Sequence, residues 1–405
     1  MVLHERKDLS ILERDNLVLG PARGRLLGIG LVLAVVGFGA SLLLSRGEGG
    51  TPRLLHAYLL NYAYMLSIAL GALWFVPLQY VTRSSWSVVV RRLAENISAT
   101  LPLWGVLAIP LLLGLPHLYP WAGPEAAHDH LLAHKAGFLS LRWFTVRLAV
   151  YFTVWSVIAL LLRRWSLRQD EDGDIAHTLR AEKLGGPALV IYGLTVTLAA
   201  FDLLMSLDPH WYSTIFGVYY FAGILVAFFA VMTILTYALQ GSGRLVHVVS
   251  LEHFNDYGRA MFAFVFFWAY IAFSQYMLIW YANIPEETVW FLRRQEHGWS
   301  LFGYLLIFGH WLLPFAGLMS RFTKRKRKLM VFWAAWLLAA HWLDLFWLVM
   351  PQASPARAGL RPVDVTMLLG MAGTMIAAVA WTSGQRSLVP RRDPRLIYSL
   401  NFENY

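Results

Sequence analysis

Long apolar runs separated by short polar segments dominate this chain of 405 residues. A helix needs about 20 apolar residues to cross the hydrocarbon core of a bilayer, and ten runs reach or approach that length. We therefore predict an all-α integral membrane protein with ten transmembrane helices. Because the number of spans is even, both termini lie on the same side of the membrane. The runs lie near residues 26–45, 54–82, 97–115, 143–162, 187–207, 214–239, 257–282, 299–320, 329–350 and 363–382.

The polar segments at the two ends complete the division of the chain. Residues 1–25 are hydrophilic and contain acidic side chains, which is not typical of a cleaved signal peptide, so we expect this segment to be retained. Residues 26–382 are the predicted transmembrane domain, and residues 383–405 are a C-terminal tail. Among the connecting segments, 163–186 contains the polar stretch RQDEDGD and is expected to be a solvated loop.

Lysine and arginine are distributed unevenly over the polar segments. The N-terminal segment, the C-terminal tail and every second loop carry 24 of the 34 basic residues, whereas the other loops carry 8. Such an excess marks the cytoplasmic side of a membrane protein, so we predict that both termini are cytoplasmic. The net charge of +10 then reflects membrane topology, and we expect no nucleic-acid partner.

The overall composition fits this class of protein. Hydrophobic residues make up 58% of the chain and charged residues 14%, whereas a soluble domain carries about 25% charged residues. The sequence contains no cysteine, which excludes disulfides, thiolate-bound zinc and iron–sulfur clusters ligated by this chain.

A few ionisable side chains lie inside the predicted helices. On insertion scales an aspartate or an arginine costs about 2.5–3.5 kcal/mol at the bilayer centre, so such residues are expected to face the interior of the bundle and to find partners there. His341 and Asp344 are three positions apart and therefore share one face of their helix. We expect Arg147 to be a charge partner. The other residues of this kind are Asp202 and His310.

Carboxylic acids and imidazoles in these positions suit proton transfer. Burial raises the pKa of a carboxylic acid, and histidine titrates near neutral pH, so both groups can gain and lose a proton. The alternative role is interhelical hydrogen bonding, worth about 0.6 kcal/mol per contact. We favour a proton path. Its candidate residues are Asp202, His310, His341 and Asp344, with Glu252 and Asp256 near Arg259 as either a hydrated entrance or an ordinary salt-bridged helix start.

Two segments of the chain share a frame that indicates an internal duplication. DLLMSLDP (202–209) and DLFWLVMP (344–351) both place an aspartate seven residues before a proline, and LAA precedes each of them. Four predicted helices separate the two copies. We therefore predict two four-helix bundles, formed by helices 2–5 and 6–9, with helices 1 and 10 at the periphery.

Histidines raise two further alternatives. HDHLLAH (128–134) places His130 and His134 on one helical face, but without a nearby carboxylate cluster a short interfacial helix is the better interpretation than a metal site. His310 and His341 lie at similar depth and would permit a bis-histidine haem. Their neighbours Trp336, Trp342 and Trp347 are bulky, and we therefore expect neither haem nor metal on this chain.

Four longer segments resemble a known family. They are FDLLMSLDPHWYSTIFGVYYFAG (201–223), FAFVFFWAYIAFSQYMLIWYANIPEET (262–288), HWLDLFWLVMP (341–351) and DPRLIYSLNFEN (393–404). Together they are similar to the F subunit of bacterial alternative complex III, within the polysulfide-reductase-type (NrfD-type) membrane proteins. The resemblance covers the chain from about the second predicted helix to the C-terminus.

The resemblance implies a subunit of the bacterial inner membrane in a complex that oxidises quinol and passes electrons to a cytochrome c or a terminal oxidase. It implies that haem c and iron–sulfur clusters belong to periplasmic partner subunits, and that a homologous C-type membrane subunit holds the quinol site. The F subunit itself is expected to bind no cofactor and to contribute a proton path. The residues that match the family segments are Asp202, Asp208, His210, Glu286, Glu287, His341 and Asp344, of which Asp208, His210, Glu286 and Glu287 are predicted to lie on the outer side.

Three functions remain open from the sequence. The first is a proton-conducting subunit, and the second is a purely structural anchor for the redox subunits. The third is a second quinone-binding subunit.

Overall fold

The computed structural model describes residues 7–47 and 50–404, and this part of the chain is helical. Ten of its helical segments are long and apolar enough to cross a membrane, as the sequence predicts. The spans are α2 (Pro21–Leu44), α3 (Gly50–Val81), α4 to α6 (Val88–Ser98, Leu101–Val106 and Ile109–Leu113), α9 (Leu141–Asp172), α10 with η3 (Ala176–Leu203 and Met205–Leu207), α11 (Phe216–Gly241), α12 (Leu251–Ala282), α14, η4 and α15 (Trp299–Leu306, Ile307–Leu312 and Leu313–Met319), α17 (Arg327–Ala353) and α18 (Pro362–Ser383).

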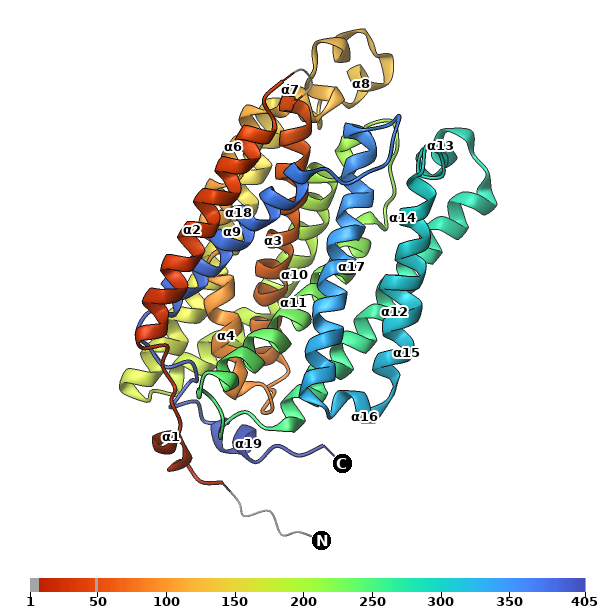
Figure 1. The fold of residues 1–405 in the computed structure, drawn as a ribbon. Helices are drawn as coiled ribbons and strands as arrows, with labels where there is room; N and C mark the ends of the chain where they lie inside the picture. Colours follow the sequence, from red (N-terminus) through yellow and green to blue (C-terminus); the bar gives the residue numbers. More distant parts are fainter. Residues whose placement is uncertain (1–6, 48–49, 405) are drawn as a thin grey trace.

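Short helices lie at the two ends of the spans (Figure 1). One end carries α1 (Ile11–Arg14), α16 (Arg321–Lys324) and α19 (Leu396–Leu400), and we name it the basic end because it also holds the run Arg321–Lys328. The opposite end carries α7 (Leu115–Leu118), η1 (Pro120–Ala122), η2 (Pro124–His128), α8 (His130–Lys135) and α13 (Pro285–Arg293). The described parts of the N-terminal segment and the C-terminal tail therefore lie at the same end, while residues 1–6 are outside the described residues.

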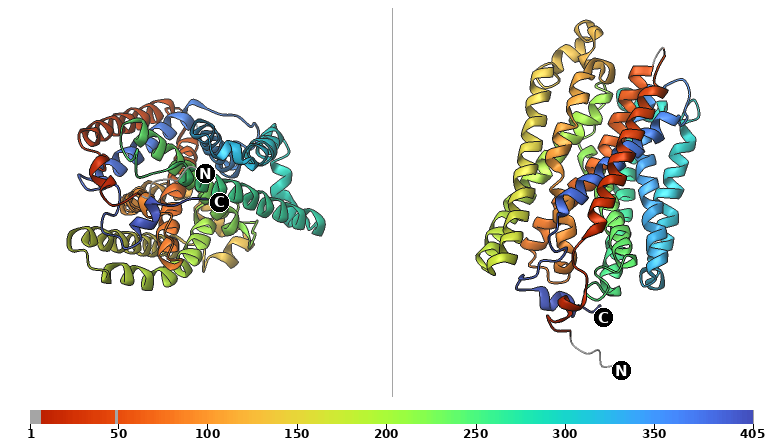
Figure 2. Two further views of the ribbon diagram at one scale, coloured as in Figure 1. Left: turned by 90° about the horizontal axis from the view of Figure 1, so that it is seen from below. Right: turned by 60° about the vertical axis from the view of Figure 1, so that its left-hand side comes forward.

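Helix α3 lies in the middle of the molecule (Figures 1 and 2) and is buried along nearly its whole length. It contacts α4, α9, α10, α11, α17 and α18. Helix α11 also contacts α10, α12 and α17, and the segment formed by α14, η4 and α15 packs against α12 and α17. The centre of the bundle is therefore formed where α3, α11, α12 and α17 meet.

The third span differs from its predicted boundaries. It begins at Val88 rather than near residue 97, because the charges of Arg91, Arg92 and Glu95 are neutralised inside the protein. Toward the opposite end Pro102, Pro110 and Pro116 each stand at the start of a new short helix, since proline lacks the N–H that a continuous helix needs.

The prediction of a solvated loop over residues 163–186 is wrong. Helix α9 continues to Asp172 and α10 begins at Ala176, so most of this segment is helical. Gly173 ends α9 with φ of 74°, a left-handed conformation that glycine adopts without steric cost. The charged side chains of this segment lie on two long helices that extend to the basic end, and several of them contact α4 and the C-terminal tail.

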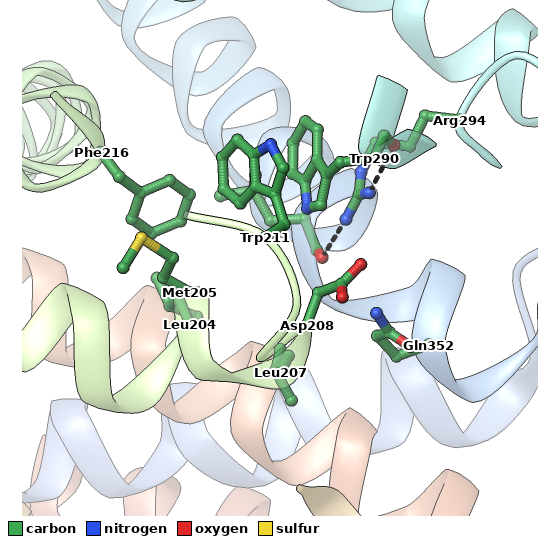
Figure 3. A pocket seen from close by; sticks show the side chains of 10 residues that line it. Leu204, Met205, Leu207, Asp208, Trp211, Phe216, Trp290, Arg294 and Gln352 are labelled. Atoms are coloured by element: carbon green, nitrogen blue, oxygen red, sulfur yellow. Dashed lines mark hydrogen bonds between the residues drawn. The ribbon is translucent and has the colours of Figure 1, made fainter. Parts of the chain in front are cut away.

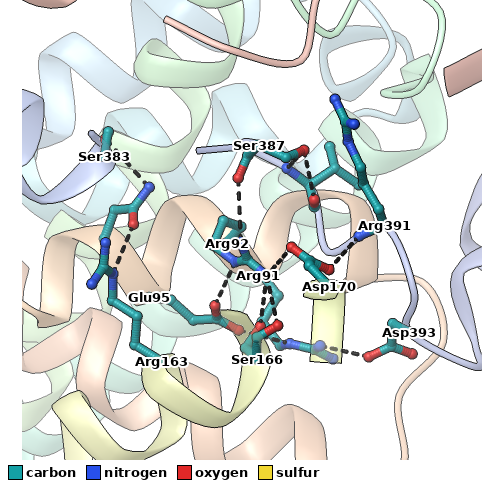
Figure 4. A network of polar contacts seen from close by, with 12 residues as sticks. Arg91, Arg92, Glu95, Arg163, Ser166, Asp170, Ser383, Ser387, Arg391 and Asp393 are labelled. Atoms are coloured by element: carbon teal, nitrogen blue, oxygen red, sulfur yellow. Dashed lines mark hydrogen bonds and ion pairs between the residues drawn. The ribbon is translucent and has the colours of Figure 1, made fainter. Parts of the chain in front are cut away.

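A buried network of charges holds the basic end together (Figure 4). Arg91 and Arg92 on α4 are each about 1% exposed and share Glu95, whose carboxylate oxygens lie 3.2 Å from Arg91 Nε and 2.8 Å from Arg92 Nε. Arg91 also binds Asp393 of the C-terminal tail at 2.6 Å, and Arg92 binds Asp170 of α9 at 2.9 Å. Burial raises the pKa of Asp393, but the Arg91 guanidinium outweighs it and holds that pKa below its usual value.

Glycines allow α2 and α18 to pack closely. A Cβ atom on Gly37 would collide with the backbone nitrogen of Gly370, and one on Gly30 would lie 2.6 Å from the backbone nitrogen of Ala377. Close backbone approach through small residues is a common mode of helix association in membranes. The peripheral helix α2 is thus attached to the bundle mainly through α18.

We predict that Gly37→Leu separates α2 from α18. The new side chain meets backbone atoms that cannot move aside without shifting a helix, so the variant should lose about 1–3 kcal/mol of stability. Gly28→Leu is the matched control, because Gly28 lies on the same helix with nothing within 4 Å of its Cβ position. Thermal unfolding in detergent, followed by tryptophan fluorescence, measures both. Equal unfolding temperatures for the two variants would contradict the packing argument.

Candidate functional site

Asp344 lies at the junction of α11, α12 and α17 and is 2% exposed. Tyr219 of α11 donates its hydroxyl hydrogen to one carboxylate oxygen, and Trp268 of α12 donates its indole N–H to the other at 3.1 Å. Both donors come from helices that contact α17. The carboxyl group is therefore held by two neutral aromatic donors, and no cation of the described residues forms an ion pair with it.

His341 lies one turn before Asp344 and faces α3. Its Nε2 lies 3.1 Å from the hydroxyl oxygen of Ser67, and that hydroxyl lies 2.7 Å from the carbonyl oxygen of Tyr64. Since the single Ser67 hydrogen is donated to the carbonyl, Nε2 carries the imidazole hydrogen and Nδ1 carries the lone pair. Within residues 7–47 and 50–404 that Nδ1 has no hydrogen-bond partner.

Gly223 of α11 makes room for the unpaired nitrogen of His341. A Cβ atom at Gly223 would lie 2.8 Å from Nδ1 of His341 and 3.9 Å from a carboxylate oxygen of Asp344. Only glycine fits this position without displacing the imidazole. The lone pair of His341 and the carboxyl group of Asp344 thus border the same small region of the bundle.

His310 is the third member of the group and is fully buried. Its ring centroid lies 3.9 Å from that of Trp268 and 6.4 Å from that of His341. Neither of its ring nitrogens has a hydrogen-bond partner among the residues that the structure describes. We name His310, His341 and Asp344 the central cluster.

A wide helical turn positions His310. The segment η4 (Ile307–Leu312) is a π-helix, and Pro314 stands two residues after its end, at the second position of α15. Proline has no N–H to donate to the carbonyl of His310 four residues earlier, which favours a local departure from α-helical bonding. Trp336 of α17 donates its indole N–H to the carbonyl oxygen of Gly309 at 2.7 Å and so satisfies one acceptor of this turn.

The central cluster combines three titratable side chains with unused hydrogen-bonding capacity. A buried polar atom without a partner costs about 1–3 kcal/mol, so three such nitrogens in one cluster call for an explanation. A water molecule, which both donates and accepts hydrogen bonds, could satisfy such nitrogens. The hydroxyl groups of Tyr219 and Ser67 hydrogen-bond to the carboxyl group of Asp344 and to the imidazole of His341, so the cluster joins titratable groups through hydroxyl side chains.

A small cavity lies one helical turn from Asp344 toward the opposite end (Figure 3). It has room of about 10 Å³ for the centre of a water molecule, which is roughly the volume that one water needs. Its lining includes Asp208, Arg294 and Phe216, and Phe216 stacks on Tyr219. The cavity therefore lies between the Tyr219–Asp344 hydrogen bond and the opposite end of the molecule.

Arg294 places a positive charge beside this cavity. Its guanidinium donates to the carbonyl oxygens of Trp290, Trp347 and Leu348 at 3.0, 3.2 and 2.9 Å and lies over the Trp290 ring. Burial lowers the pKa of Arg294 to about 9, and the Asp208 carboxylate opposes that shift, so the side chain stays charged at neutral pH. In the described part of the chain it has no ion pair with a carboxylate.

Asp202 is held differently from Asp344. Arg147 of α9 donates to both of its carboxylate oxygens, at 2.7 and 2.9 Å, and the hydroxyl of Tyr151 donates to one of them at 2.9 Å. Arg147 is thus the charge partner that the sequence analysis expected. Asp202 lies on α10, apart from the central cluster, and its hydrogen-bonding capacity is largely used.

The remaining predicted residues lie away from the central cluster. Glu252 binds Arg325 at 2.9 Å and Asp256 binds Arg259 at 3.2 Å, as in a salt-bridged helix start at the basic end. At the opposite end Asp208 binds Arg293 at 2.8 Å, and His210 lies 2.7 Å from Asp129. Glu286 and Glu287 occupy the first turn of α13, where the helix dipole favours negative charge.

Sequence reasoning missed several residues around the cluster. Tyr219, Trp268 and Ser67 stand in ordinary apolar runs, so nothing in the sequence distinguishes them from packing residues. Pro314 was a usable signal for the wide turn at His310. A buried ion pair between Arg53 and Asp364 near the opposite end was also not predicted.

The geometry bears on the metal alternative. Within the described ranges no group of three or more His, Asp or Glu side chains could hold a metal ion, and the rings of His130 and His134 lie 5.9 Å apart on the short helix α8.

No family model matches the chain, and a search of curated proteins found no match. The class of protein follows from the structure of the described residues. This is an all-α multi-pass membrane protein with ten candidate spans and ionisable side chains buried among them.

Proposed function

We propose that this protein is an integral membrane subunit that carries protons through its central cluster. The observation that supports this proposal most is the state of His310, His341 and Asp344. All three are buried, none has an ion-pair partner of opposite charge in the described residues, and three of their nitrogen atoms have no hydrogen-bond partner. The ion pair of Arg147 with Asp202, by contrast, is held by several side-chain hydrogen bonds.

The proposed proton route leads from the cluster toward the opposite end. Asp344 is hydrogen-bonded to Tyr219, and the small cavity beside Arg294 and Asp208 comes next. Asp208 then pairs with Arg293, which is half-exposed. Protons that reach Asp344 could thus exchange with the opposite end through Tyr219 and one water molecule.

Toward the basic end the contacts are less favourable to proton transfer. Met261 and Val265 of α12 and Leu337 of α17 are buried apolar residues between the cluster and that end. Glu252 precedes Trp268 by 16 positions on α12, or about 24 Å along a helix axis. We therefore infer that Glu252 and Asp256 are salt-bridge residues, and that protons from the basic end require water to enter between α11, α12 and α17.

The resemblance of the four sequence segments extends this proposal to a complex. We propose that the chain acts as the F subunit of an alternative complex III, a quinol:electron-acceptor oxidoreductase of the bacterial inner membrane. Its partners would be a homologous C-type membrane subunit with the quinol site, and periplasmic subunits that carry haem c and iron–sulfur clusters. Both termini would be cytoplasmic, which agrees with the position of Arg321–Lys328 at the same end as α1 and α19.

We also propose that the ten helices comprise two four-helix bundles. Helices α3, α4 to α6, α9 and α10 contact one another, as do α11, α12, α14 to α15 and α17. The pair α2 and α18 packs on the outside of the first group. This grouping supports the duplication indicated by DLLMSLDP and DLFWLVMP, and Asp202 and Asp344 would be equivalent residues of the two copies.

The test is to replace Asp344 by Asn and His341 by Phe in the complex that contains this chain. We expect quinol oxidation to continue while the number of protons moved per electron falls in vesicles, because neither replacement can exchange a proton. Asp364→Asn is the matched control, since Asp364 is buried and paired with Arg53 outside the cluster. Unchanged protons per electron in the Asp344→Asn and His341→Phe variants would reject the proposal.

A structural anchor is the second candidate. The fully partnered Asp202 and the charge network at the basic end favour it, because such groups fix helices relative to one another. Under this alternative Asp344→Asn should impair assembly or leave all activities unchanged. A third candidate, a second quinone-binding subunit, predicts quinone in an organic extract of the purified chain.

A further inference from the structure

A groove opens on the side of the molecule near the basic end. It lies between the peripheral pair α2 and α18 on one side and α5 and α9 on the other, and its volume is about 1250 Å³. Leu27, Leu31, Leu103, Leu160 and Ala378 contribute to its apolar walls. Ligand pockets for small soluble molecules measure about 300–1,000 Å³, so this groove is larger than such a ligand requires.

The rim of the groove is rich in arginine. Arg163, Arg164 and Arg168 project from the last turns of α9, and Arg386 follows the end of α18. Glu171 is the one acidic residue in the described lining. The lining therefore carries an excess of three positive charges at the basic end.

The four arginines of the rim are not paired with carboxylates. Arg163 donates to the side-chain oxygen of Asn96 at 3.1 Å and to the carbonyl oxygen of Thr382. Between residue 7 and residue 404, leaving out 48–49, none of the four forms an ion pair with an acidic side chain. The contrast with Arg91 and Arg92 close by is clear, because those two bind three carboxylates (Figure 4).

The polar and apolar parts of the groove follow the depth of a bilayer leaflet. Leu160 precedes Arg168 by eight residues, which is about 12 Å along a helix axis. Leu27 and Leu31 lie in the first half of α2, which begins at the basic end. Arg168 and Arg386 thus lie at the level of lipid headgroups. Arg163 and Arg164 lie one helical turn from Leu160, about 5–6 Å along the axis, at the boundary with the apolar walls that face the acyl chains.

We propose that this groove binds a phospholipid with an anionic headgroup from the leaflet at the basic end. The planar guanidinium group donates two parallel hydrogen bonds to a phosphate, and basic pockets between membrane helices on the cytoplasmic side suit anionic headgroups. The acyl chains lie along Leu27, Leu31 and Leu160. The lipid then fills the space between the α2–α18 pair and α9.

The proposal is independent of proton transfer, because it rests on a surface far from the central cluster. It requires only that the chain spans a membrane. A transmembrane helix of another subunit is the competing occupant of the groove, but a helix would have to bring its own carboxylates to satisfy the rim.

The experiment compares lipid binding by the full chain in detergent. The purified protein is delipidated and incubated with phosphatidylglycerol or with phosphatidylcholine, and bound lipid is measured by native mass spectrometry. Phosphatidylglycerol should bind more tightly than phosphatidylcholine. The triple variant Arg164→Gln, Arg168→Gln and Arg386→Gln should weaken phosphatidylglycerol binding about 100-fold, since each basic residue near a headgroup contributes about fivefold.

The control removes the same charge elsewhere at the basic end. Arg180→Gln, Arg321→Gln and Arg391→Gln affect exposed arginines that do not line the groove, so the preference for phosphatidylglycerol should persist. Equal binding of the two lipids by the unaltered protein would overturn the proposal. So would an equal loss in both triple variants, or a helix of another subunit seated in the groove of the assembled complex.

Discussion

Replacing Arg92 by Leu is expected to destabilise the protein by about 3–5 kcal/mol, the usual cost of removing one partner from a buried ion pair. Arg92 is about 1% exposed and donates to Glu95, Asp170 and both oxygens of Ser166. Its loss leaves Glu95 and the Ser166 carbonyl short of a donor inside the protein. It also removes the contact to the carbonyl oxygen of Ser387 in the C-terminal tail.

Denaturant unfolding in micelles at neutral pH, followed by tryptophan fluorescence, measures this effect. The pKa of Asp393 is depressed in the folded state, so its contribution to the network is present at neutral pH and is lost only as the pH falls through that lowered pKa. The stability of Arg92→Lys should lie between that of the unaltered protein and that of Arg92→Leu, because lysine keeps the charge but not the forked geometry of the guanidinium. Arg180→Leu, at an exposed site of the same end, is the control. If Arg92→Leu unfolds at the same denaturant concentration as Arg180→Leu, the network does not stabilise the fold.

The ten spans were predictable because an apolar run of sufficient length has few alternatives to a membrane helix. The end of a span was less predictable where charges are neutralised by tertiary contacts. Arg91, Arg92 and Glu95 look too polar for a buried helix, yet their partners Asp170 and Asp393 come from distant segments. Hydropathy counts each charge singly and cannot detect such pairing.

Part of the central cluster was also predictable. The spacing of three residues placed His341 and Asp344 on one face of their helix. The expected depth of His310 placed it near His341, and the centroids of the two imidazole rings lie 6.4 Å apart. The donors to Asp344 were not predictable, because tyrosine and tryptophan are common in apolar helices. Arg294 was hidden for another reason, since it lies in a loop and its partners are backbone carbonyls.

Asp202 and Asp344 show most clearly that the role of a residue cannot be predicted from its sequence context alone. Their sequence frames are alike, and the sequence gives both the same role of proton carrier. The structure gives them different partners, an arginine for Asp202 and two neutral aromatic donors for Asp344. The Arg147 guanidinium already uses both carboxylate oxygens of Asp202, so we infer that Asp202 is structural and that Asp344 is the carboxyl group suited to proton exchange.

This difference leads to a second large effect on stability. Arg147→Leu should cost about 3–5 kcal/mol, because it leaves the fully buried Asp202 carboxylate with Tyr151 as its remaining side-chain donor. The double variant Arg147→Leu with Asp202→Leu should recover most of the loss, because a pair of apolar side chains can replace a buried ion pair at little cost. Unfolding in micelles measures each variant.

The double variant also separates structure from proton transfer. If Asp202 is structural, a protein that lacks both Asp202 and Arg147 should fold and should keep its protons per electron, whereas Asp344→Asn should fold and lose them. The reverse pattern, with proton movement lost in the double variant and kept in Asp344→Asn, would assign the path to the α9–α10 side of the molecule. Because the two aspartates sit in matching sequence frames, this comparison tests partner chemistry rather than position as the cause of function.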